Sequence, residues 1–329
     1  MGIEIENMMS PFDYPTALHK LLSQVDYERM NTIVPPLNKV DIGRMLELAA
    51  HLEDPHLCAP VIHIAGTKGK GSVAAMVSSI LTCAGLRTGL FTSPHLHTFT
   101  ERIRLNGQPI TKEEFARQFS RVWPCVDTMG QSSDYGKPST FEILTAMAFG
   151  TFREAGVDVQ VLEVGLGGRL DSTNIADADV AVITRLSLDH TAILGNQLEL
   201  IAKEKAGIIK KNSPLIVGKQ KKETLKIIKK IANNLKAKTF FYKKNWFIKK
   251  NKKENHIIFF NNVKNNKKEK YPQPGLIGDH QIINAGIALK AFNLIMKEKV
   301  NKNFIKNGLK NVQWPGRLQK IHLNKKLFS

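Results

Sequence analysis

The stretch that most limits the fold is an apolar segment, residues 61–65 (VIHIA), that runs directly into the glycine-rich segment 66–72 (GTKGKGS). An apolar strand that breaks into glycines and then continues as a helix can hold phosphate, because glycines let backbone N–H groups approach an anion closely. Lys70 adds a positive charge, and the apolar spacing of residues 73–82 predicts a helix whose N-terminus lies under the phosphates. The sequence therefore predicts a nucleotide site in an α/β fold.

The glycine-rich segment departs from the strict P-loop pattern at two positions. Ile64 stands where the pattern has its first glycine, and Gly71 stands where a metal-binding Ser or Thr would follow the lysine. We therefore interpret the segment as a shortened variant whose metal ligand comes from elsewhere. The alternative is a connection that binds no ligand. Three glycines, two lysines and two hydroxyl residues within the segment argue against that alternative.

A second apolar strand is predicted at residues 158–164, and it ends in the carboxylate of Glu163. A carboxylate at the C-terminal end of a strand, beside a phosphate loop, is typical of the Mg²⁺ ligand in α/β nucleotide enzymes. The glycines that follow also suggest a dinucleotide-binding fingerprint. Leu170 occupies its third glycine position, however, and no helix-forming run follows, so a nicotinamide site is disfavoured.

A third polar cluster, with Asp189 and His190, follows an apolar strand predicted at residues 180–184. A single histidine after a strand is more often a hydrogen-bonded structural residue than a metal ligand. Neutral imidazole can nevertheless bind a divalent cation, and Asp189 or a backbone carbonyl could fix its tautomer. Both interpretations of His190 remain open on the residues alone.

Taken together, these motifs resemble those of the folylpolyglutamate synthase/dihydrofolate synthase family, a branch of the Mur ligase superfamily of ATP-dependent amide-forming ligases. The resemblance extends over nearly the whole chain. It rests on segments that occur in the family's order: 66–72, 92–96 with 101–103, 162–171, 189–190, 204–208, 278–285 and 314–318.

The resemblance implies a role for each matching residue, with ATP and Mg²⁺, in two metal sites, as cofactors. The implied phosphate-binding residues are Gly66, Thr67, Lys68, Gly69, Lys70, Gly71 and Ser72. The implied metal ligands are Ser93, Glu163, His190 and Lys205, the last of which the family carbamylates with CO₂. Asn284, with Gln281 beside it, matches an adenine contact, and Arg317 matches an interdomain arginine that reaches the phosphates. Lys70, Lys205 and His190 are the implied catalytic residues.

The implied reaction is ATP-dependent addition of L-glutamate to dihydropteroate, to folates or to their polyglutamates, through an acyl phosphate. Charge neutralisation and alignment are what such a phosphoryl transfer needs, and a lysine, metal ions and backbone N–H groups supply them. Two other functions remain open: a P-loop kinase or ATPase that acts on a different acid, and a catalytically silent ATP-binding fragment. The resemblance also implies a monomer with small-molecule substrates.

Three separated cysteines, Cys58, Cys83 and Cys125, lack metal-ligand spacing and suggest reduced thiols in a cytoplasmic protein. We expect no signal peptide, because residues 1–10 are acidic and lack a basic start and an apolar core. No apolar run approaches the length of a membrane span, so we expect no membrane partner.

Charge is distributed unevenly along the chain. Residues 1–200 contain 16 Lys+Arg and 23 Asp+Glu, a net charge of −7, whereas residues 201–329 contain 32 and 6, a net charge of +26. The lysines alternate with asparagine more than with aromatic residues, so we expect a solvated surface and no nucleic-acid partner. The step near residue 200 leads to the hypothesis that two differently biased homologous sequences are joined. A uniform composition of the coding DNA across the step would rule that out.

The predicted fold is α/β, with a P-loop and a mostly parallel sheet flanked by helices, as in a Mur ligase central domain, plus a small antiparallel addition. Residues 1–314 are predicted to form this ATP-binding domain, and 315–329 to begin a linker to a C-terminal domain that the chain lacks. Expected strands are 61–65, 87–92, 159–164, 180–184 and 214–218, with antiparallel additions at 239–242, 246–249 and 256–261. Expected helices are 39–52, 72–83, 112–123, 140–155, 198–208, 222–233 and 280–297, with a mobile loop at 127–137.

Overall fold

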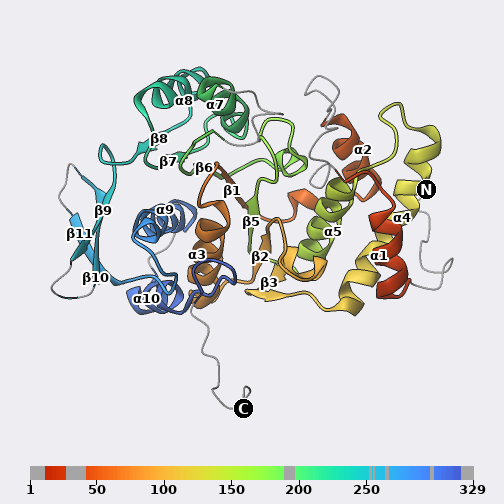
Figure 1. Ribbon diagram of the computed structural model, residues 1–329, viewed down its shortest axis with the longest axis horizontal. Helices are drawn as coiled ribbons and strands as arrows, with labels where there is room; N and C mark the ends of the chain where they lie inside the picture. Colours follow the sequence, from red (N-terminus) through yellow and green to blue (C-terminus); the bar gives the residue numbers. More distant parts are fainter. Residues whose placement is uncertain are drawn as a thin grey trace, which may run out of the picture.

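An eight-stranded sheet runs through the middle of the protein, with helices on both of its faces (Figure 1). The computed structural model describes residues 12–26, 42–188, 197–251, 254, 256–263, 267–296 and 300–319. The strands of the sheet are β1 (Val61–Ala65), β2 (Thr88–Phe91), β3 (Ile103–Leu105), β4 (Gln108–Pro109), β5 (Val159–Glu163), β6 (Val180–Ile183), β7 (Leu215–Val217) and β8 (Thr239–Phe241).

The order of the strands across the sheet is β4, β3, β2, β5, β1, β6, β7, β8. All neighbouring strands from β2 to β8 are parallel, and the sheet becomes antiparallel at the β3–β4 edge. This confirms the predicted fold class. The chain passes from β1 to β2 in one direction and from β5 to β6 in the other, so β1 lies where the strand order reverses. Ligands of open α/β sheets bind outside the carboxyl ends of the strands at such a point.

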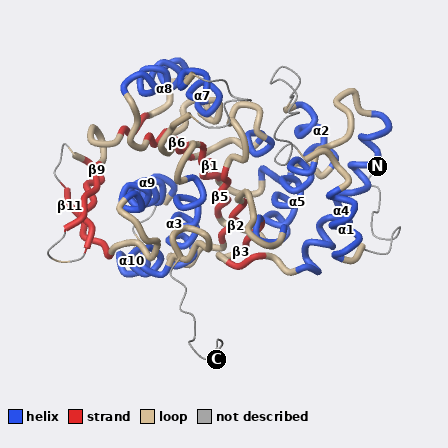
Figure 2. Tube along the Cα trace, viewed as in Figure 1, coloured by secondary structure: helices blue, strands red, loops and turns tan. Residues whose placement is uncertain are grey.

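Helices cover the sheet because its strands are apolar on both sides. The helices longer than one turn are α1 (Tyr14–Leu22), α2 (Gly43–His51), α3 (Lys70–Cys83), α4 (Lys112–Ser132), α5 (Thr140–Glu154), α7 (Leu198–Ala206), α8 (Lys222–Asn234), α9 (His280–Ile295) and α10 (Lys302–Asn311). In β1, Ile62 and Ile64 belong to the core beneath α3 and α9, whereas Ala65 belongs to the core beneath α7 and α8. Figure 2 shows the strands between these groups of helices.

A separate antiparallel sheet packs against α9 at one edge of the molecule (Figure 1). It consists of β9 (Phe247–Asn251), β10 (His256–Asn262) and β11 (Lys267–Pro272), with β10 in the middle. Trp246, Ile248 and Phe259 are buried and share a core with α9. The antiparallel addition is therefore confirmed, and Trp246 belongs to the core.

The structure corrects two expectations about local structure and adds elements that were not predicted. Residues 239–241 form β8, which pairs with β7 in parallel and extends the main sheet, because the crossover helix α8 returns the chain in the same direction. Residues 127–132 belong to α4 and not to a loop, since Val126 and Met129 continue its buried apolar stripe. The sequence analysis missed the lysine-rich strand β11, which has little apolar alternation of its own and pairs with β10. It also missed α1, α10 and the short strands β3 and β4.

Candidate functional site: a phosphate loop at the switch point

The glycine-rich segment leaves β1 and enters α3 within five residues, and two of its glycines are required by geometry. Gly66 has φ +152°, and a Cβ there would lie 1.8 Å from the Thr184 hydroxyl oxygen. Gly69 is the N-cap of α3 with φ +93°, a left-handed conformation that favours glycine. The first intrahelical bond runs from Val73 N to Gly69 O, at 3.0 Å. The N–H groups of the preceding residues therefore start the helix without intrahelical partners, as an anion site requires.

The neighbouring strand end fixes the first half of the loop. The backbone N–H groups of Thr67 and Lys68 both donate to the carbonyl oxygen of Arg185, at 3.1 Å. The Thr67 hydroxyl donates to the carbonyl oxygen of Ser187, also at 3.1 Å. These bonds attach the loop to the segment that follows β6, so the loop is shaped before any ligand binds. Thr67 and Lys68 thus contribute to the loop partly through their backbone.

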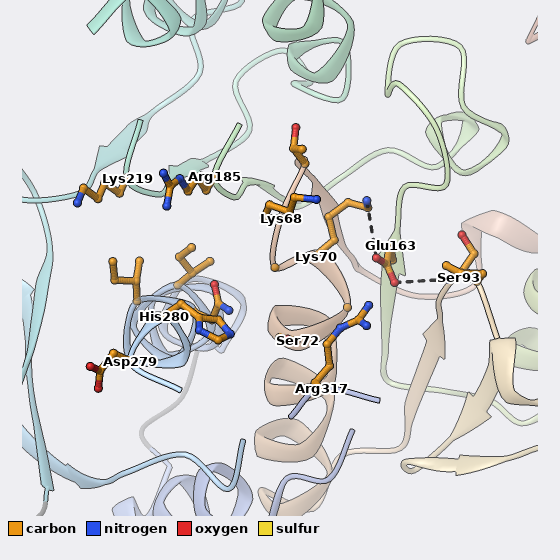
Figure 3. Close-up of a pocket in the computed structure, with 17 residues that line it drawn as sticks. Lys68, Lys70, Ser72, Ser93, Glu163, Arg185, Lys219, Asp279, His280 and Arg317 are labelled. Atoms are coloured by element: carbon orange, nitrogen blue, oxygen red, sulfur yellow. Dashed lines mark hydrogen bonds and ion pairs between the residues drawn. The ribbon is translucent and has the colours of Figure 1, made fainter. Parts of the chain in front are cut away.

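A carboxylate and a lysine face each other beside the loop (Figure 3). Glu163, at the end of β5, is 4% exposed, and its Oε1 lies 4.0 Å from the Nζ of Lys70. The backbone N–H of Ser93 donates to Oε2 of the same carboxylate, at 3.4 Å. Lys70, Ser93 and Glu163 therefore lie close together, although they lie on α3, after β2 and on β5. Their roles in phosphate and metal binding stay predictions.

Helix α9 forms the opposite wall. The Gln281 amide donates to the Ser72 hydroxyl at 3.3 Å, and the Asn284 amide donates to Oε1 of Gln281 at 2.8 Å. Asn284 also approaches the loop, since a Cβ on Gly69 would lie 2.8 Å from its Oδ1. The predicted pair Gln281 and Asn284 thus contacts the phosphate loop directly. Gln281 is buried and supports the phosphate loop through Ser72, whereas Asn284 lines the cavity.

A cavity of about 770 Å³ lies between the loop, α9 and the segment around Arg317. Its lining includes all the predicted phosphate-loop residues except Gly66, together with Ser93, Glu163, Asn284 and Arg317. The structure adds residues that were not predicted as part of the site: Pro94, Arg185, Lys219, Asp279, His280, Ile283 and Ile287. Arg185 and Lys219 follow β6 and β7 at the carboxyl edge of the sheet, a position that could have marked them from the sequence.

One end of the cavity contains the phosphate loop, Ser93 and Glu163, and is here called the phosphate end. The donors present there fit one Mg²⁺ ion. Mg²⁺ prefers oxygen ligands and is usually held by one or two carboxylates together with substrate phosphates and water. Glu163 supplies a carboxylate and Ser93 a hydroxyl oxygen, and both line the cavity. Within the described ranges, no group of three or more His, Cys, Asp or Glu side chains forms a metal cluster. An ion at this position would therefore rely on phosphate oxygens for much of its coordination.

Two predicted residues are not brought to this cavity by the described structure. Lys205, on α7, is 3% exposed, and its Nζ donates to the carbonyl oxygen of Gly167 at 3.4 Å. It lies behind the loop that follows Glu163 and is not part of the cavity lining. His190 and its neighbour Asp189 fall outside the described residues. The carbamylation of Lys205 and the second metal site remain predictions.

A buried polar chain supports the loop that follows Glu163. The Thr173 hydroxyl donates to Oδ1 of Asp171, and Nε2 of His63, in β1, lies 2.8 Å from the same hydroxyl oxygen. Oδ2 of Asp171 accepts the N–H of Leu166 at 2.9 Å. Complete burial, assisted by Lys210, lowers the pKa of His63 to about 3, so its ring is neutral. Burial raises the pKa of Asp171, although its hydrogen bonds oppose this. The chain ties the phosphate-loop strand to the carboxylate loop.

The loop that carries Ser93 is closed by a second carboxylate. Glu101, in the short helix η4 (Phe99–Arg102), accepts the backbone N–H groups of Leu96, His97 and Thr98 at 2.8–3.0 Å. Partial burial acts to raise the pKa of Glu101, but these three bonds outweigh it and lower the pKa. The carboxylate therefore fixes the loop as an anion and leaves Glu163 as the carboxylate that faces Lys70.

The middle-domain model of the Mur ligases matches residues 64–292, which include the phosphate loop, Glu163 and α9. The chain belongs to the Mur ligase family. A dihydrofolate synthase/folylpolyglutamate synthase of Bacillus subtilis is 38% identical over 298 residues, a match that covers 86% of this chain and 66% of that protein. This chain therefore spans slightly less than two thirds of that relative. These matches confirm the predicted resemblance to the folylpolyglutamate synthase/dihydrofolate synthase family.

Solved structures of the same family share the fold. A Mycobacterium tuberculosis folylpolyglutamate synthase complexed with ADP and AMPPCP is 32% identical, with a TM-score of 0.81, over 93% of this chain and 68% of that one. Escherichia coli FolC in complex with DHPP and ADP is 33% identical, with a TM-score of 0.80, over 95% and 69%. In the part of the Mur ligase chain that the structure describes, no helix is long and apolar enough to cross a membrane.

Proposed function

We propose that this Mur ligase chain binds Mg-ATP in the 770 Å³ cavity and takes part in ATP-dependent addition of L-glutamate to dihydropteroate or a folate. The observation that carries the proposal is the arrangement of that cavity. Lys70, Ser93 and Glu163 lie at one end, beside the phosphate loop, and Lys219 and His280 lie toward the other (Figure 3). Ile283 and Ile287 of α9 give the lining its apolar part. A nucleoside triphosphate has the same division between a charged end and a flat, largely apolar end.

At the phosphate end, the N–H groups of the first turn of α3 and the Lys70 ammonium hold the β- and γ-phosphates. The loop's bonds to Arg185 hold the backbone that leads into this turn, so the N–H groups need little rearrangement when the phosphates bind. Ser93 and Glu163 would hold the ion, which would supply neutralisation of the phosphate charge during transfer. Arg317 lines the same cavity and adds a further positive charge.

The proposed reaction has two steps. An oxygen of the substrate carboxylate attacks the γ-phosphorus, the bond to the bridging oxygen breaks, and ADP leaves with that electron pair. The amine of glutamate then attacks the acyl carbon of the acyl phosphate, loses a proton, and expels inorganic phosphate to give the amide. The chain's contribution to the first step is alignment and charge stabilisation, which suits a site built from backbone N–H groups and cations.

Two observations support the choice of substrates. The relatives that match over most of this chain are named for dihydrofolate and folylpolyglutamate synthesis, and one solved relative holds DHPP together with ADP. The choice between dihydropteroate and a reduced folate is part of the proposal. The division into a domain at 1–314 and a linker from 315, the cytoplasmic location and the monomeric state stay predictions.

The acyl phosphate provides the sharpest test of the proposal. The chain would be incubated with Mg-ATP, hydroxylamine and either dihydropteroate or tetrahydrofolate, and the products analysed by mass spectrometry. We expect ADP release that depends on the pteridine acid, together with the hydroxamate of that acid. Mg-ATP binding without ADP release would identify a silent fragment, and ADP release independent of both acids would favour a kinase or ATPase of another specificity. Either result would contradict the proposal.

A further inference from the structure

Trp314 connects the segment that carries Arg317 to the loop that carries Ser93. It follows α10 and is half-buried at the edge of the core beneath α3. The guanidinium of Arg104 lies over its ring, 4.9 Å from the centroid. Arg104 is itself fixed, because its Nε donates to the carbonyl oxygen of Glu101 at 3.1 Å and its Nη1 to that of Gly107 at 3.2 Å. The tryptophan therefore rests on a cation that is held in place independently.

The other edge of the indole reaches the phosphate end of the cavity. A Cβ on Gly71 would lie 3.1 Å from Nε1 of Trp314 and 3.3 Å from Oε2 of Glu163. The indole N–H and the carboxylate thus approach the same point on the first turn of α3. Gly71 lies within that turn, where any side chain would meet both groups. Trp314 and the proposed metal ligand Glu163 therefore both border Gly71.

Residues 315–317 then turn back toward the cavity. Gly316 has φ +75° and packs against Leu96, since a Cβ there would lie 3.1 Å from Cδ1 of that leucine. Arg317 lines the cavity, and its guanidinium points toward the end that contains Glu163 (Figure 3). Arg317 is exposed and has no secondary structure around it to fix its place. Its position depends on how the segment is attached on either side.

We propose that Trp314 is a positioning residue that acts on nucleotide binding through Arg317. Its stacking on Arg104 and its edge contact at Gly71 set where Arg317 enters the phosphate end. This inference rests on the proposed function, since it presumes that the cavity binds Mg-ATP. It assigns Trp314 a role in ligand binding, whereas a purely structural role would affect only the stability of the fold.

A double-mutant cycle on the full chain tests the inference, with Mg-AMPPCP affinity measured by calorimetry. We expect Arg317→Gln to weaken binding about tenfold, because it removes a charge-assisted phosphate contact. Trp314→Ala should weaken binding to a similar extent, and the double variant no further than either single variant, since both remove the same contact. Trp314→Phe should restore most of the affinity, because it keeps a ring for Arg104 to stack on.

Controls separate this inference from its alternatives. Leu318→Ala alters an exposed residue next to Arg317 and should leave the affinity unchanged. The inference would be overturned if the loss of affinity in the double variant equalled the product of the two single losses, or if Trp314→Ala bound like the wild type. Either result would leave the proposed function intact. A wild-type chain that does not bind Mg-AMPPCP would instead overturn the proposed function, and the inference with it. The urea midpoint of each variant shows whether a loss of affinity is caused by unfolding.

Discussion

The two ends of the cavity are built in different ways. The phosphate end consists of consecutive residues on one loop, joined by a carboxylate at the end of the adjacent strand. The other end, the nucleoside end, is assembled from Arg185 after β6, Lys219 after β7 and the face of α9 that bears His280 and Ile283. A binding element with local sequence determinants can be recognised in a single chain. One assembled from distant elements becomes visible only when the fold brings them together.

The largest expected effect on stability comes from a change in the backbone of the phosphate loop. Gly66→Ala should reduce the free energy of unfolding by about 2–4 kcal/mol, because its Cβ would collide with the Thr184 hydroxyl. Urea denaturation measures the loss. Gly85→Ala is the matched control: it also has a positive φ, +92°, but open space around its Cβ, and should cost about 1–2 kcal/mol. Equal losses in the two variants would contradict a tightly packed phosphate loop.

The buried support beneath the phosphate end gives a second, smaller effect that depends on pH. The pKa of His63 is about 3 in the folded chain and near 6.5 when unfolded, so protons bind the unfolded state more tightly. The stability that His63 contributes above pH 6.5 is lost as the pH falls toward 3. The free energy of unfolding falls in the wild type when the pH is lowered from 7.5 to 5. In His63→Gln this fall should be smaller by about 2 kcal/mol.

Urea denaturation of both proteins at the two pH values makes this comparison. The exposed residue Asn234 provides the control, since Asn234→Gln should leave the wild-type pH dependence in place. If His63→Gln lost as much stability as the wild type, the ring would not be neutral and buried as described.

The nucleoside end should give the smallest effect. Asn284→Ala should weaken Mg-AMPPCP binding by about 1 kcal/mol, or roughly fivefold, because it removes a single neutral polar contact. Affinity for Mg-tripolyphosphate, which has no nucleoside, should stay unchanged in the same calorimetric experiment. Asn233→Ala, on the exposed face of α8, is the control. Equal losses for both ligands would mean that Asn284 serves the phosphates, and the division between the two ends would fail.

The phosphate end could be predicted from the sequence to a greater extent than the other end of the cavity. The strand, loop and helix of residues 61–83 could be predicted because their apolar spacing and glycines are local features, and Glu163 because it ends an apolar strand. The contact between Ser93 and Glu163 depends on the order of β2 and β5 in the sheet, and the family resemblance supplied it. Arg185 and Lys219 were missed because neither belongs to a recognised motif, although each follows a strand at the carboxyl edge of the sheet. The extent of α4 and the direction of β8 were wrong because tertiary packing decided both.

The central claim is that the phosphate end of this cavity binds Mg-nucleotide through Lys70, and calorimetric titration with Mg-AMPPCP tests it most directly. Lys70→Ala should weaken binding by about 1.5–3 kcal/mol, because a charge-assisted phosphate contact is lost. Lys219→Ala, which removes the same charge from the other end of the same cavity, should weaken it much less. Equal affinity of Lys70→Ala and the wild type would contradict the account.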